Sequence, residues 1–123
     1  GIMDGHWIFY HENGIKEKEG VLNNGNADGL WTFWDDETNK VQEGSFTNGI
    51  KEGQWTAWLE DGRLTEGYYV NGKKNQTWTS WWDYQRSRKE MQGSYDNGKM
   101  IDKWFFYDKN GNLKEIRYFS PDF

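Results

Sequence analysis

The sequence predicts an all-β fold, an antiparallel meander of repeated β-hairpins that forms an elongated, twisted sheet. Three markers recur along the 123 residues with nearly one period: an Asn-Gly pair, a Glu-Gly or Gln-Gly pair, and a Trp. The Trp series has successive spacings of 24, 24, 23 and 26 residues and consists of Trp7, Trp31, Trp55, Trp78 and Trp104. Three markers that keep one period indicate an internal repeat.

The repeat unit is clearest in residues 43–58, EGSFTNGIKEGQWTAW. Two alternating runs flank Asn48-Gly49, and Asn-Gly in this setting is the strongest short-range hairpin signal because both turn residues need a positive φ. The same turn is predicted at Asn24-Gly25, Asn71-Gly72 and Asn97-Gly98. The chain therefore reads as a single domain of about ten sequentially paired strands without a helix. Its five repeats cover approximately residues 5–28, 29–52, 53–75, 76–101 and 102–119.

In chain order, the first repeat has a strand over residues 6–10, a turn at Asn13-Gly14 and a returning strand over residues 15–22. The second repeat, residues 30–47, carries an acidic hairpin tip at residues 35–39. A calcium site at this tip lacks the spacing and the central Gly of an EF-hand loop, so we expect a solvated turn.

The third repeat turns at Asp61-Gly62, and the fourth departs most from the pattern. Gln76 replaces the usual Gly there, Trp82 is an additional aromatic residue, and a longer basic loop follows at residues 83–89. Insertions in repeat proteins often lie on the binding face, although loops also tolerate neutral insertions.

The two ends of the sequence carry further signals. Gly1 aligns with the turn glycines, so the sequence starts inside a repeat. Two explanations are open: the chain is a fragment of a longer array, or Gly1-Ile2 is a cloning scar before Met3. In the fifth repeat Arg117 replaces the strand Gly, and Pro121 follows. A charged residue and a Pro discourage further strand pairing, so these changes suit a closing strand.

Alternation along the strands places the Trp series on one face of the sheet, where we expect the core. A second series occupies the opposite face and comprises Tyr10, Trp34, Trp58, Trp81 and Tyr107. The second series either closes another core surface or lines a groove.

Composition narrows the classes of function. The net charge is −5, with −8 in residues 1–62 and +3 in residues 63–123. An acidic first half argues against nucleic acid and suits a basic protein partner, although an unevenly charged solvated surface is the alternative. Cysteine is absent, which excludes disulfides, thiolate zinc sites and a Cys nucleophile and leaves the compartment open. No apolar run approaches the roughly 18–20 residues of a membrane helix and no signal peptide is visible, so we expect no membrane insertion.

No catalytic motif is visible, and we predict a protein that is not an enzyme and has no cofactor or metal. His6 and His11 have an odd spacing, which prevents joint chelation on a regular strand. Glu19, Glu43 and Glu66 form a ladder about 9–10 Å apart, loosely like the carboxylates of inverting glycosidases. Regular repetition argues against one catalytic pair, and we expect these carboxylates beside cross-strand Lys or Thr.

The combination G-x-W-x-x-[WY], an Asn/Asp-Gly turn and E-G-x-[YF]-x-N-G-x-x-[DE]-G resembles the MORN-type repeat, closest to its bacterial Trp-containing variant. The resemblance covers nearly the whole chain. It implies a scaffold for partner binding, and similar arrays occur in bacterial antitoxin and immunity proteins.

These observations predict a non-catalytic protein–protein interaction module, and the resemblance implies the antitoxin or immunity type, with a basic toxin as partner. The predicted binding residues are Trp34, Trp58, Trp81, Trp82, Arg86, Arg88 and Tyr107. The alternative for Trp82 is local packing in a longer hairpin. The alternative function is binding of a cell-wall or surface glycan through exposed aromatic rings, whereas lipid binding lacks the cationic surface it needs.

Overall fold

The computed structural model describes residues 2–120, so the expectations for Gly1 and Pro121 lie outside the described residues. Ten strands follow one another along the chain: β1 (Gly5–Tyr10), β2 (Lys16–Asn23), β3 (Asn26–Trp34), β4 (Lys40–Thr47), β5 (Ile50–Trp58), β6 (Leu64–Val70), β7 (Lys73–Trp81), β8 (Lys89–Asp96), β9 (Lys99–Tyr107) and β10 (Leu113–Phe119). They form one sheet in sequence order, each strand antiparallel to the next. The predicted all-β hairpin meander is confirmed.

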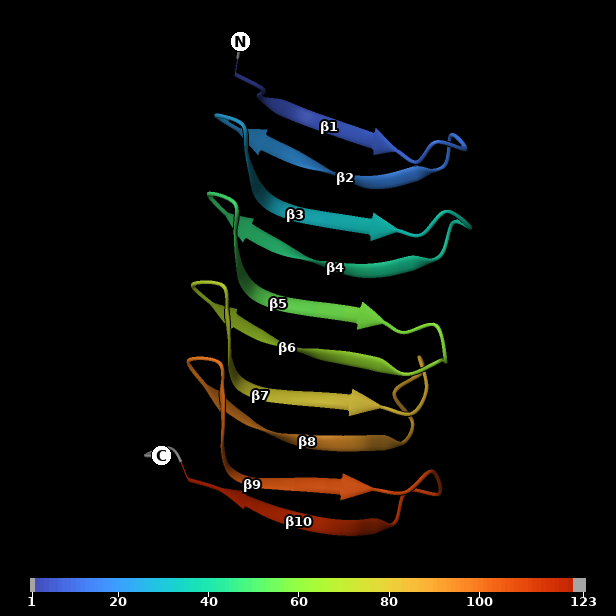
Figure 1. The fold of residues 1–123 in the computed structure, drawn as a ribbon, viewed down its shortest axis with the longest axis vertical. Coiled ribbons are helices and arrows are strands. Elements are labelled where there is room, and N and C mark those ends of the chain that lie inside the picture. Colours follow the sequence, from blue (N-terminus) through green and yellow to red (C-terminus); the bar gives the residue numbers. More distant parts are fainter. Residues whose placement is uncertain (1, 121–123) are drawn as a thin grey trace.

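Five hairpins, β1–β2 to β9–β10, stack along the long axis of the molecule (Figure 1). We call the loops that close these hairpins tips 1 to 5; they span residues 11–15, 35–39, 59–63, 82–88 and 108–112. All tips lie at one end of the strands, and the Asn-Gly turns that join successive hairpins lie at the other end (Figure 1). Within residues 2–120 there is no helix that is long and apolar enough to cross a membrane.

The Asn-Gly turns have the predicted backbone. Asn48 and Gly49 have φ angles of 50° and 80°, and Gly72 has 79°. These turns are also bonded to the hairpin that they follow, because the Gly49 N–H donates to the carbonyl of Ala27 in β3 at 2.8 Å and the other turn glycines make the same kind of bond. Each turn is thus held at the start of the preceding hairpin.

A second positive-φ position bends β3, β5, β7 and β9 near their first residues. It is occupied by Gly29 and Gly53 in two strands but by Gln76 (φ 61°) and Asp102 (φ 60°) in the others. Register irregularities between the paired strands accompany the bend. The predicted repeats from 29 onward each begin at this position, so their boundaries fall inside strands. Gln76, which replaces the usual Gly, therefore keeps the positive φ that Gly adopts most easily.

The core is built from Trp rings that lie flat against strand glycines. A Cβ atom added to Gly44 would be only 2.1 Å from Cδ2 of Trp55. The Trp55 Nε1–H donates to the carbonyl of Ser45, the residue after this glycine, at 2.9 Å. The same arrangement pairs Gly20 with Trp31, Gly67 with Trp78, and Gly93 with Trp104. These four Trp side chains are buried, as predicted.

The prediction that Trp7 belongs to the core is wrong. This side chain is 37% exposed. Among residues 2–120 β1 is an edge strand and no strand glycine lies against the Trp7 ring, and the Trp7 indole N–H bonds to the nearby Asp4 carbonyl. At the opposite edge of the sheet, Arg117 pairs with Trp104 at the position of the strand glycines, and within residues 2–120 no later Trp needs the space.

Aromatic edges and lysine side chains close the exposed side of the Trp rings. Phe46 meets Trp55 edge-on with ring centroids 5.0 Å apart, and Tyr69 meets Trp78 in the same way at 5.2 Å. The Lys51 ammonium lies 4.4 Å from the Trp55 ring. A single-layer sheet can therefore bury large rings without a second layer, since its own side chains cover them.

The opposite face carries one fully buried side chain, Leu64, which pairs across the strands with both Trp58 and Trp81. Lys40 and Lys89 occupy the equivalent positions in the neighbouring hairpins, where they pair with Trp34 and Trp81. The second aromatic series thus contributes a small apolar core at the third and fourth hairpins. The sequence had left open whether this series closes another core surface or lines a groove.

Candidate functional site

The second aromatic series lies in one row beside the tips. Trp34, Trp58, Trp81 and Tyr107 are the last residues of β3, β5, β7 and β9, so the meander places them in register along one edge. All four are half-buried, whereas Tyr10 in the first hairpin is exposed. We call this row, together with the tips, the tip edge.

The other predicted binding residues lie in tip 4, which is two residues longer than the other tips. Trp82 Nε1 donates to the Asp108 carbonyl at 3.0 Å, and Arg88 Nη1 donates to the Lys109 carbonyl at 2.8 Å. Arg86 Nε donates to the Glu66 carboxylate at 2.9 Å. The structure therefore gives Trp82, Arg86 and Arg88 intramolecular partners on the hairpins before and after their own.

The Glu ladder makes local contacts, and the one at Glu43 is the predicted cross-strand contact with Thr. Glu43 accepts a hydrogen bond from Thr32 Oγ1 at 2.6 Å. Glu19 lies 2.9 Å from Lys16 Nζ, and hydrogen bonds from Lys16 and then His6 lower the pKa of its carboxyl. Glu66 differs, because it accepts from Trp81 Nε1 at 2.8 Å as well as from the loop arginine. Glu19 and Glu43 thus bond within their own hairpins, whereas Glu66 bonds to the fourth hairpin.

The two histidines have separate partners. His6 Nε2 is 2.6 Å from Glu19, and His11 Nε2 donates to the Trp34 carbonyl at 2.9 Å. Among residues 2–120, no group of three or more His, Cys, Asp or Glu side chains could hold a metal ion.

Tips 1 and 2 are joined by the His11 bond and by Asn13 Nδ2, which donates to the Asp36 carbonyl at 2.8 Å. Tips 3 and 4 are joined by the Tyr84 hydroxyl, which donates to the Leu59 carbonyl. Arg63 of tip 3 reaches the β8 residue Glu90 at 2.9 Å. Tips 4 and 5 are joined by Trp82 and Arg88, as described above.

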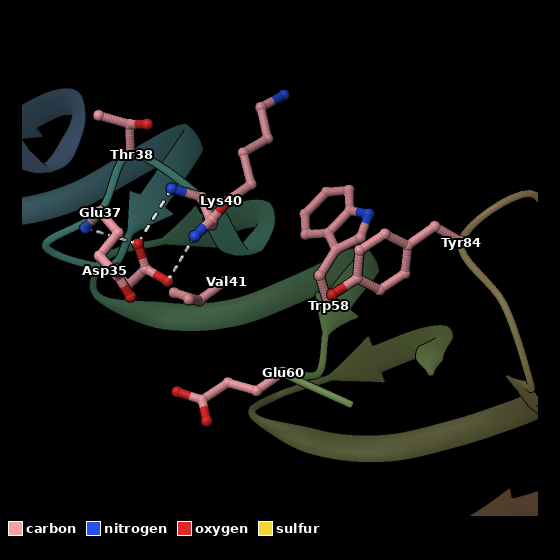
Figure 2. Close-up of a pocket in the computed structure, with 9 residues that line it drawn as sticks. Asp35, Glu37, Thr38, Lys40, Val41, Trp58, Glu60 and Tyr84 are labelled. Atoms are coloured by element: carbon pink, nitrogen blue, oxygen red, sulfur yellow. Dashed lines mark hydrogen bonds between the residues drawn. The ribbon is translucent and has the colours of Figure 1, made fainter. Parts of the chain in front are cut away.

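Tips 2 and 3 are the exception. Within residues 2–120, no hydrogen bond or ion pair joins tip 2 or its strand ends to tip 3 or its strand ends. An open groove of about 680 Å³ lies at this junction. Its lining residues are Asp35, Glu37, Thr38, Asn39, Lys40, Val41, Trp58, Glu60 and Tyr84. In Figure 2 the tip 2 turn forms one wall of the groove, Trp58 and Tyr84 form the other, and Glu60 extends from tip 3 below them.

The groove is acidic. The Asp35 carboxylate accepts backbone N–H bonds from Glu37 and Asn39 at 2.9 and 3.0 Å (Figure 2). These bonds, that of Glu37 foremost, lower the pKa of the Asp35 carboxyl and keep it ionised. The Asp35 carboxylate is thus bonded within its own turn, whereas Glu37 and Glu60 are the exposed carboxylates of the groove lining.

One cation lines the groove. The Lys40 ammonium lies 5.7 Å from the centroid of the Trp58 ring and 3.4 Å from Glu43. It marks the Trp58 ring as a surface on which a positive charge is accommodated.

Sequence reasoning named Trp58 but missed Tyr84, Glu37 and Glu60. Tyr84 is 41% exposed and belongs to the insertion in the fourth repeat, yet the fold brings it back over the third hairpin. An aromatic residue in an inserted loop was the signal that could have found it. Nothing in the sequence indicates that this loop leans toward tip 3.

Comparison with protein-family models finds none that matches this chain, and comparison with curated proteins finds no significant match. The resemblance to MORN-type repeats therefore rests on the repeat motif itself.

Proposed function

We propose that this protein is a non-catalytic protein–protein interaction module that binds its partner through the tip edge. The observation that carries this proposal is the row of half-buried aromatic side chains with an open groove at one of its members, Trp58. Trp and Tyr dominate interface hot spots because they bury a large area and keep a polar atom for hydrogen bonding. A rigid sheet holds them in fixed register, which lowers the entropy that binding must remove.

The charge distribution supports a basic partner. The groove lies between the second and third hairpins, where tips 2 and 3 carry acidic side chains, and residues 1–62 have a net charge of −8. Such a surface steers a cationic protein toward the groove and disfavours nucleic acid. An antitoxin or immunity role, with a basic toxin as the partner, is the specific form of the proposal that the repeat motif favours.

Within the predicted binding set, we assign direct contact to the row of half-buried rings, which consists of Trp34, Trp58, Trp81 and Tyr107. Trp82, Arg86 and Arg88 act differently, since they hold tip 4 between its neighbours. Their substitution is expected to loosen the tip edge as well as weaken binding.

The test is capture of a protein partner by immobilised full-length chain, followed by affinity measurement with variants. Trp58→Ala and Tyr107→Ala are expected to weaken binding of the captured protein at least tenfold, about 1.4 kcal/mol. Tyr118→Ala is the matched control, because this aromatic side chain is exposed but lies near the other end of its strand. Trp82→Ala is expected to lower the melting temperature as well.

Two results would contradict the proposal. One is equal weakening by the Tyr118 control. The other is retention of the chain on an insoluble glycan with no protein captured, which favours the glycan alternative.

A further inference from the structure

The links between neighbouring tips share one chemistry. At three junctions a side-chain donor of one tip reaches a backbone carbonyl of the neighbouring tip or its strand end. The donors are His11, Asn13, Tyr84, Trp82 and Arg88, and the acceptors are the carbonyls of Trp34, Asp36, Leu59, Asp108 and Lys109. Neighbouring tips are thus held together by donated hydrogen bonds.

At the junction of tips 2 and 3, no side-chain donor of either tip reaches a carbonyl of the other among residues 2–120. Besides the donors Thr38, Asn39 and Lys40, the groove carries the exposed carboxylates of Glu37 and Glu60 and is also lined by the rings of Trp58 and Tyr84. Such a groove is complementary to a group that is cationic, rich in donors and flat enough to lie on an aromatic ring.

The third and fourth hairpins show which group meets this description. Arg63 of tip 3 donates to Asp61 at 2.9 Å and to Glu90 at 2.9 Å, and the same hollow is lined by Trp82. An arginine between two carboxylates, in a hollow that a tryptophan also lines, therefore joins tip 3 to the fourth hairpin within the chain. The residue of tip 2 equivalent to Arg63 is Asn39, since each closes its tip with a carbonyl that accepts the N–H of the first tip residue. Its side chain is too short to extend across the groove.

We infer that the groove between tips 2 and 3 receives an arginine side chain from a basic segment of the protein partner, which replaces the missing internal arginine. This inference rests on the proposed function and deepens it. The guanidinium plane stacks on Trp58 and Tyr84 while its N–H groups donate to Glu37 and Glu60. Arginine suits this site better than lysine, because a planar fork of five donors can serve two carboxylates and a ring face together.

The inference is tested by NMR titration of the ¹⁵N-labelled chain with an acetylated Gly-Gly-Arg-Gly-Gly amide peptide. Peptides with lysine or citrulline in place of arginine are the ligand controls, since citrulline keeps the shape and loses the charge. The arginine peptide is expected to shift the indole N–H signal of Trp58 most strongly. Citrulline is expected to bind at least tenfold more weakly, and lysine to fall between them.

Variants locate the site. The double substitution Glu37→Gln and Glu60→Gln is expected to weaken arginine-peptide binding at least tenfold. Glu12→Gln is the matched control, because it removes one exposed charge from tip 1, whose junction is already filled. Asn39→Arg supplies an internal arginine to the groove and is expected to block the peptide, whereas Lys40→Met removes a like charge and is expected to tighten binding.

Equal binding of the citrulline peptide, equal weakening by Glu12→Gln, or signal changes centred on Trp34 or Trp81 would overturn the inference. The proposed function is judged separately by the captured protein. If that protein loses affinity on Tyr107→Ala but not on the double Glu substitution, only the arginine assignment fails.

Discussion

Replacement of Gly44 by Ala tests whether the strand glycines exist to support the Trp rings. The added Cβ atom would be 2.1 Å from Cδ2 and 2.3 Å from Cε2 of Trp55. Carbon atoms pack at about 3.5 Å or more, so the ring must move by about 1.4 Å. Phe46, 5.0 Å away edge-on, and the Lys51 ammonium, 4.4 Å from the ring, block that movement.

The cost follows from this confinement. Overpacking a core by one methyl group costs about 1–3 kcal/mol, and removing a buried Trp side chain costs about 3–5 kcal/mol. Gly44→Ala combines the clash with loss of the Trp55 hydrogen bond to Ser45, so we expect about 3 kcal/mol. For a chain of this size that corresponds to a decrease in melting temperature of about 12 °C, at about 4 °C per kcal/mol.

Urea and thermal denaturation measure the effect, and a double-mutant cycle assigns its cause. In a Trp55→Ala background, Gly44→Ala should cost less than about 0.5 kcal/mol, because the clashing ring is gone. Arg117→Ala, at the equivalent position with no Trp above it among the described residues, should also be nearly neutral. If Trp55→Ala alone unfolds the chain, a displaced Trp55 indole N–H signal in Gly44→Ala supplies the assignment.

The reasoning is refuted if Gly44→Ala melts within about 1 °C of the parent protein. It is equally refuted if the full cost persists after Trp55 is removed, since the glycine would then be needed for its backbone alone.

Three further predictions concern the backbone and pH. Gly49→Val and Gly72→Val should each cost more than about 1 kcal/mol in urea denaturation, because φ angles of 80° and 79° exclude β-branched side chains; parental stability in both would contradict the turn assignment. Gln76→Gly should stabilise the chain by about 0.5–1 kcal/mol, because glycine adopts a φ of 61° without strain. Thr77→Gly is the control: Thr77 is not among the positive-φ residues, so this change should destabilise the chain. The pKa of Asp35 is lowered from 3.8 in the folded state, so its contribution to the stability of the fold is complete above about pH 4 and is lost as the pH falls through the lowered pKa. The urea midpoint should therefore fall less steeply in acid for Asp35→Asn than for the parent protein. An unchanged pH profile in this variant would contradict the role of Asp35.

The sequence determined the repeat and its hairpins by itself. An Asn-Gly pair between alternating runs leaves the backbone one favourable turn, and its recurrence fixes the number and order of strands. The burial of Trp31, Trp55, Trp78 and Trp104 also followed from alternation, since one face of a strand sees every second residue.

Only the tertiary structure decided what lies across strands and between tips. The role of Gly44 could not be read from the sequence, because it pairs across the strands with both Trp31 and Trp55 and only the folded structure shows that the Trp55 ring lies against it. The exposure of Trp7 depends on which strand lacks a neighbour, and alternation carries no information about that.

The groove between tips 2 and 3 is the clearest case. Sequence patterning reports on residues within one hairpin, where separation along the chain is short and spacing is regular. Tyr84 reaches the Leu59 carbonyl across 25 residues, because the inserted loop folds back toward the third hairpin. Such long-range contacts depend on how whole hairpins stack, so the place where no contact forms, and where a partner can bind, is a property of the folded molecule.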